Sequence, residues 1–118
     1  MKKIMYVLLL ASSVYSLKPA FNNAGTLRMN TCNITADTFN NTGKVFCKEG
    51  TLKCQKFSGD GLIEITNGTL YIHAENFLFT GTIRCTENGK CIIETKTPEK
   101  NIHFKHEGNG KVTFKYIY

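Results

Sequence analysis

The sequence has no tryptophan, and it contains only two prolines and three histidines among its 118 residues. Its five cysteines form no Cys-x-x-Cys pair. Only His103 and His106 lie close together among the histidines, and three-residue spacing on a strand points them to opposite faces. These absences argue against a zinc site. A nucleophile elbow, a phosphate-binding glycine loop and a zinc-protease helix are missing too. We therefore predict no metal, no cofactor and no enzymatic activity.

Long hydrophobic runs are also missing, apart from the stretch between Ile4 and Ala11. This run follows Lys2 and Lys3 and precedes small residues, a pattern typical of a signal peptide, here residues 1–16. Because the run is too short to span a bilayer, we expect no transmembrane anchor. The sequence thus predicts export to the periplasm or the extracellular space.

Clusters of basic residues are absent. Beyond the predicted signal peptide the chain carries 13 basic and 9 acidic residues, an excess that favours acidic partners over basic ones. No run of lysine or arginine follows the pattern that tracks a phosphate backbone, so we predict no nucleic-acid partner. We interpret most lysines as solubilising residues on outward strand positions.

What the sequence does contain is a repeat. Residues 31–43 and 69–81 match without a gap at Thr, Ile, Ala, acid, Phe, Thr and Gly, and residues 51–61 resemble a shortened copy. Short segments with apolar second and fourth residues open at Gly25, Gly43, Gly61, Gly81 and, more distantly, Gly110. This alternation predicts short strands with one buried face.

The spacing of these units predicts an all-β, single-domain parallel β-solenoid over residues 17–94, with a loop and capping strands over residues 95–118. Residues one unit apart then stack about 4.8 Å apart. Val45, Ile63 and Ile83 are expected to form one such column. The alternative is an antiparallel β-sandwich or meander, because Asn-Gly turns also favour hairpins. Stacking requires equivalence between units, whereas hairpins do not, so the solenoid is preferred.

The cysteines allow two interpretations. An exported small domain often uses disulfides, and two pairs flank turns. These candidate pairs are Cys85 with Cys91 and Cys47 with Cys54. In the repeat, however, cysteines stand where other units have isoleucine or leucine: Cys47 aligns with Ile65, Cys54 with Ile72 and Cys32 with Leu70. That equivalence favours small buried apolar side chains.

Two acidic residues occupy equivalent places in the repeat. In a solenoid, Asp37 and Glu75 would lie two coils apart, about 9 to 10 Å at the usual strand spacing. This separation is near the upper limit for the acids of an inverting glycosidase. The intervening unit has no acid there, so we treat the pair as weak binding candidates rather than as catalytic residues.

Aromatic residues supply the other binding candidates. Phe46, Tyr71 and Phe79 fall at positions expected to point outward or to lie near a corner, where rings can stack on sugars or contact a protein. Packing under the C-terminal cap is the alternative for some of them. His73 takes the outward position that Thr35 has in the earlier unit.

The Gly-x-apolar-x-apolar units resemble those of bactofilin-type β-solenoids, which form filaments. The resemblance implies self-association, although the export signal departs from that cytoplasmic family. Our leading hypothesis is an exported, non-enzymatic repeat protein that presents a flat surface to a protein or glycan partner or stacks end to end. Two alternatives stay open: a carbohydrate-binding or carbohydrate-active module using Asp37 and Glu75, and a disulfide-stapled secreted protein that binds or inhibits a partner protein.

Overall fold

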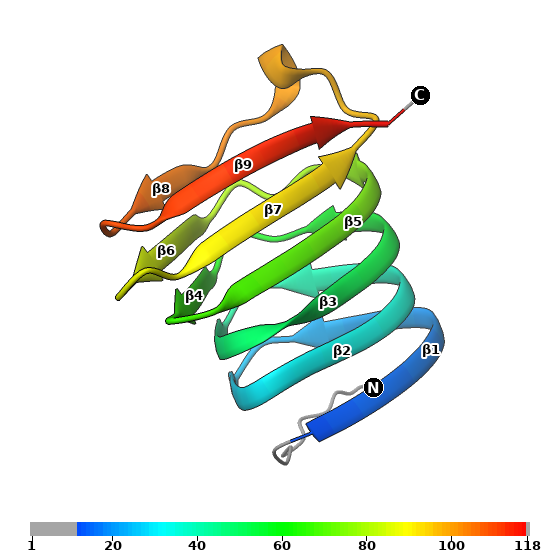
Figure 1. Ribbon diagram of the computed structural model, residues 1–118. Helices are drawn as coiled ribbons and strands as arrows, with labels where there is room; N and C mark the ends of the chain where they lie inside the picture. The colour runs from blue at the N-terminus through cyan, green and yellow to red at the C-terminus, as the bar shows by residue number, and fades with distance from the viewer. Residues whose placement is uncertain (1–11, 118) are drawn as a thin grey trace.

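The computed structural model describes residues 12–117 and forms a parallel β-solenoid of about five coils (Figure 1). The predicted solenoid is confirmed, and the antiparallel alternative is wrong because every strand pairing among these residues is parallel. The elements are β1 (Ser12–Asn23), β2 (Thr26–Asn41), β3 (Lys44–Ser58), β4 (Leu62–Thr66), β5 (Thr69–Phe77), β6 (Thr82–Thr86), β7 (Lys90–Thr95), the 3-10 turn η1 (Glu99–Asn101), β8 (Lys105–Glu107) and β9 (Lys111–Tyr116). Most of the predicted signal peptide, residues 1–11, lies outside the described residues.

One continuous sheet winds around the core. Its order is β8-β6-β4-β3-β5-β7-β9, and β2 pairs with both β1 and β3. The long strand β3 pairs with β4 along its first part and with β5 along its second part, so it belongs to two sides of the coil. From the third coil onward these sides are separate strands, joined by a turn in which Asn67 has a φ of 56°.

The expected column of aliphatic residues is present. Val45 pairs with Ile63, and Ile63 pairs with Ile83, while Leu27 extends the column by one coil. All four side chains are buried. Successive members are 18, 18 and 20 residues apart, so the coil length follows the repeat in the sequence.

The glycines that open the units stack as closely as the backbone allows. A Cβ on Gly43, Gly61 or Gly81 would lie 2.0 to 2.1 Å from the carbonyl oxygen of the preceding glycine in the column. The column begins at Gly25, whose carbonyl accepts a 2.8 Å hydrogen bond from the amide of Lys44. Any side chain would force adjacent coils apart, which explains why the repeat is marked by glycine.

The third side of each coil carries an aromatic column. The rings of Phe21, Phe39, Phe57 and Phe77 follow one another at centroid distances of 5.2, 5.2 and 5.4 Å, with interplanar angles below 20°. At the adjoining corner, the buried Asn23 amide donates to Asn41 Oδ1 (2.9 Å). Buried amides of this kind require partners, and the two asparagines also donate to backbone carbonyls.

The predicted alignment of residues 51–61 is wrong by two residues. Leu52 pairs with Ile72, and Cys54 pairs with Ala74 rather than with Ile72. The unit is full length, because Gly50 takes the core position that Cys32 and Leu70 occupy in the neighbouring coils. A hydrophobic pattern does not detect a core position that is occupied by glycine.

The C-terminal segment adds a further coil. β8 pairs with β6 and β9 pairs with β7, in parallel and in register. Gly110 therefore precedes the second strand of this coil, whereas the coil opens at Lys105, whose amide donates to Gly81. Four side chains of this region are half-buried against the end of the core: Ile102, Phe104, Val112 and Phe114.

Candidate functional site

The coil has three outward surfaces. We call the outward side of β4, β6 and β8, with the first parts of β2 and β3, the first face. The second face is the outward side of residues 69–74 of β5, of β7 and β9, and of the parts of β2 and β3 in register with them. The third side follows the aromatic column. Five of the six candidate binding residues are distributed over these three surfaces, and Phe79 lies in the core, so they do not form one site.

The first face carries a column of charged and aromatic side chains in adjacent coils. Its members, in register, are Arg28, Phe46, Glu64, Arg84 and Glu107. Phe46 is half-buried, and the guanidinium carbon of Arg28 lies 4.4 Å from its ring centroid. Phe46 thus points outward as predicted, but its ring face is already covered by a cation.

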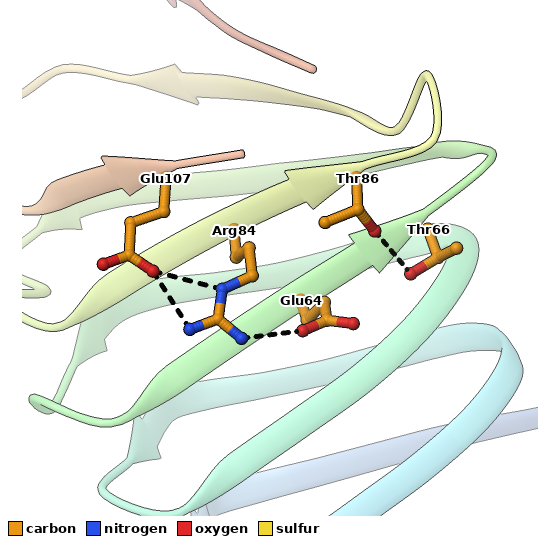
Figure 2. A network of polar contacts seen from close by, with 5 residues as sticks. All are labelled: Glu64, Thr66, Arg84, Thr86 and Glu107. Carbon is orange, nitrogen blue, oxygen red and sulfur yellow. Dashed lines mark hydrogen bonds and ion pairs between the residues drawn. The ribbon is translucent and has the colours of Figure 1, made fainter. Parts of the chain in front are cut away.

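Arg84 links its two neighbours in this column (Figure 2). Its Nη1 donates to Glu64 Oε1 at 3.1 Å, and its Nε and Nη2 donate to Glu107 Oε1 at 3.1 and 3.0 Å. The hydrogen bonds from Arg84, and then that from Lys105, lower the pKa of the Glu107 carboxyl. Beside this network the Thr66 and Thr86 hydroxyls lie 3.0 Å apart. The charges of Glu64, Arg84 and Glu107 are therefore paired within the protein.

The second face is more open. Tyr71 points outward as predicted, with 43% of its surface exposed. Its partners on the adjacent strands are Thr51 and Ile92. His73 is half-buried on this face, where its Nδ1 lies 3.1 Å from Glu94 Oε1, so it has a partner rather than a free ring.

The third side holds the two acidic candidates without bringing them together. Asp37 and Glu75 are both exposed, and the register of their neighbours places Gln55 between them. Glu75 Oε1 lies 3.9 Å from Lys96 Nζ, in an ion pair at the surface. The two acids are thus two coils apart, as the repeat predicts, and Glu75 has a basic partner.

The prediction that Phe79 is an outward aromatic binding residue is wrong. It is 1% exposed and packs edge-on against Phe57 at 5.4 Å, while its neighbour Leu78 is 47% exposed. Phe79 lies two residues before Gly81, in the inward corner position that the buried Asn23 and Asn41 take before Gly25 and Gly43, so it points into the core. It cannot contact a partner.

The five cysteines are free and buried, so neither expected disulfide is present. Cys47 and Cys85 lie in the same inward column as Met29 and Ile65, and Cys54 lies between two alanines. Burial raises the pKa of the Cys47 and Cys54 thiols to about 12 and that of Cys85 to about 11. Burial also raises the pKa of Cys32 and Cys91. Such thiols are poor nucleophiles because the thiolate is the reactive form.

Sequence reasoning missed a groove at the corner between the first and second faces. It measures about 430 Å³ and is lined by Thr31, Glu49, Gly50, Thr51, Gly68, Thr69 and Tyr71. Two of its lining residues are glycines, and no sequence motif marks the site. The available signal was the pair of glycines, Gly50 and Gly68, one coil apart beside an outward tyrosine.

No family model, curated protein or solved structure matches this chain. Among residues 12–117, no three histidine, cysteine or acidic side chains are grouped as metal ligands. Within the same range, no helix is long and apolar enough to cross a membrane. The site is therefore interpreted from its own geometry.

Proposed function

We propose that the chain is an exported, non-enzymatic binding protein that presents its second face to a partner. The observation that supports this proposal is the exposed Tyr71, held on a sheet whose register is fixed by a filled core. A ring on a rigid strand binds without the cost of ordering a loop. The first face is the weaker candidate, since Glu64, Arg84 and Glu107 already bind one another.

The lack of an enzymatic role is argued from the chemistry of the candidate groups. The thiols are buried with raised pKa values, and His73 is paired with Glu94. Asp37 and Glu75 stand apart on an exposed surface. A catalytic group needs access to substrate and a matched partner, and none of these side chains combines the two.

Export rests on the predicted signal peptide. Cleavage after Ser16 would remove the start of β1 and leave Leu17–Asn23 paired with β2, including the stacked Phe21. The aromatic column would therefore survive processing. Fusing residues 1–24 to a reporter that is active only outside the bacterial cytoplasm tests this step. An inactive reporter would contradict export.

Site-specific photo-cross-linking tests the binding role. A benzophenone amino acid at position 71 should yield a discrete cross-linked product in the cells that make the protein. The same group at position 78, equally exposed on the third side, should not. Equal products from both positions, or none from position 71, would contradict a role for the second face.

End-to-end association is a second candidate, favoured by one observation. The outer edges of β8 and β9 end the sheet, and half-buried Phe104 and Phe114 lie beneath them. Against it, Lys105, Lys111 and Lys115 stand on this last coil, where lysines discourage edge pairing. Sedimentation velocity over a wide dilution series tests this candidate. If the protein is a monomer at all concentrations, end-to-end association is excluded.

A further inference from the structure

Two glycines that line the corner groove stack closely on the backbone of the coil beneath. A Cβ on Gly50 would lie 1.9 Å from the carbonyl oxygen of Cys32, and one on Gly68 would lie 2.1 Å from that of Lys48. Neither position accepts a larger residue without moving the backbone. The stacking of the coils therefore keeps both positions beside Tyr71 free of side chains.

The groove combines hydroxyls, one carboxylate and one aromatic ring. The hydroxyls belong to Thr31, Thr51 and Thr69, the carboxylate to Glu49 and the ring to Tyr71. Among the described residues, none of these side chains takes part in a hydrogen bond or ion pair within the protein. Their polar atoms are thus available to a ligand.

Two classes of ligand fit this site poorly. An extended peptide adds to a sheet through an open strand edge, whereas β3 here is paired on both sides. An anionic ligand, such as a nucleic acid or a sulfated glycan, would meet the carboxylate of Glu49 with no lysine or arginine in the lining. The remaining chemistry is uncharged or cationic, rich in hydroxyls and able to stack on a ring.

We propose that this groove binds a neutral or amino-bearing saccharide. One apolar face of the sugar ring packs on Tyr71, while the ring hydroxyls donate to Glu49 and exchange hydrogen bonds with the threonines. The groove volume of about 430 Å³ lies in the range of small-ligand sites, and its open ends let a longer glycan chain continue across the surface. This inference rests on the proposed function, because it names the ligand class of the second face.

Titration of the ¹⁵N-labelled protein with four oligosaccharides tests the proposal. The hexamers of cellulose, chitin, mannan and chitosan, each added to about 10 mM, cover weak single-site affinities. At least one should shift the backbone amides of residues 49–51 and 68–71. Tyr71→Ala should weaken that binding about tenfold, as expected for loss of one stacking contact. Glu49→Gln should weaken it as well, and Tyr71→Phe should retain it.

Leu78→Ala is the matched control, because it removes an equally exposed apolar side chain from another surface. Its affinity should equal that of the unmodified chain. The saccharide site is overturned if none of the four hexamers shifts these amides, or if Tyr71→Ala binds with the affinity of the unmodified chain. If the hexamers are silent while position 71 still cross-links to a protein, the saccharide inference fails and the proposed function stands.

Discussion

The inward and outward columns of this solenoid have the same spacing but opposite rules of composition. Inside, like stacks on like: Phe39 lies on Phe57 at 5.2 Å, and the Asn23 amide bonds to that of Asn41. On the first face, the charged members of the column alternate in sign, since Arg84 separates Glu64 from Glu107. Identical rings or amides gain from stacking, whereas identical charges at this spacing repel. Sequence repetition is therefore a property of the core, and the surface is free to vary.

The largest test of this contrast is Phe57→Ala. The ring lies between Phe39 and Phe77 and meets Phe79 edge-on. Removing a buried ring of this kind should cost about 3 to 5 kcal/mol of unfolding free energy. Urea denaturation measures the loss. Leu78→Ala, on the outside, should stay within about 0.5 kcal/mol. Similar losses for the two variants would show that the columns are not energetically distinct.

The next test removes a polar member of the core. Asn41→Ala leaves the buried Asn23 amide and the carbonyl of Leu62 without their partner, which should cost about 1 to 3 kcal/mol. Asn76→Ala, at an exposed position on the same side of the coil, is the control and should be nearly neutral. If Asn41→Ala leaves the unfolding free energy in urea almost unchanged, water replaces the hydrogen bonds that Asn41 makes with Asn23 and Leu62.

The same contrast explains what could be predicted from the sequence. The stacking of Val45, Ile63 and Ile83 was predictable because like residues recur at a fixed spacing, and Tyr71 was correctly placed on the outside. Gly50 misled the alignment because a core position without a side chain carries no hydrophobic signal.

Three other features were not predictable, each for a physical reason. Phe79 points inward because it takes the buried corner position of Asn41, and an asparagine in the equivalent unit does not indicate a core position for a ring. The Arg84 network joins unlike residues, so no repeat reveals it. The corner groove is lined in part by Gly50 and Gly68, and two glycines in adjacent coils match no binding motif.

A third test concerns the buried thiols. They are uncharged core side chains at neutral pH, and their burial opposes ionisation at alkaline pH. Burial raises the pKa of Cys47 from 9.0 to about 12. The folded state then keeps its proton while the unfolded state loses it, so stability is complete below pH 9 and falls as the pH rises toward 12. For this thiol the loss is about 1.4 kcal/mol at pH 10.

Cys47→Ala separates this effect from packing. The variant is less stable than the unmodified chain at pH 8, but its further loss between pH 8 and pH 10 in urea denaturation should be smaller. In parallel, iodoacetamide at pH 8 should label the described cysteines only after denaturant is added. Rapid labelling of the native protein would contradict their burial.

The smallest expected effect lies on the first face, in Glu107→Gln. Hydrogen bonds from Arg84 and Lys105 lower the pKa of the Glu107 carboxyl below 4.5. Its contribution to stability is therefore present above pH 4.5 and is lost as the pH falls through the lowered value. Exposed ion pairs contribute little, so the change in Tm at pH 7 should be slight.

The pH dependence of Tm is consequently the decisive readout for this column. Between pH 5 and pH 3 the Tm of the unmodified chain should fall more steeply than that of Glu107→Gln. Glu87→Gln changes an exposed turn residue that has no ion pair among the described residues, and it should keep the steeper slope. Parallel slopes for all three proteins would mean that the outward column orders side chains without stabilising the coil, so the contrast between inside and outside would be one of energy as well as composition.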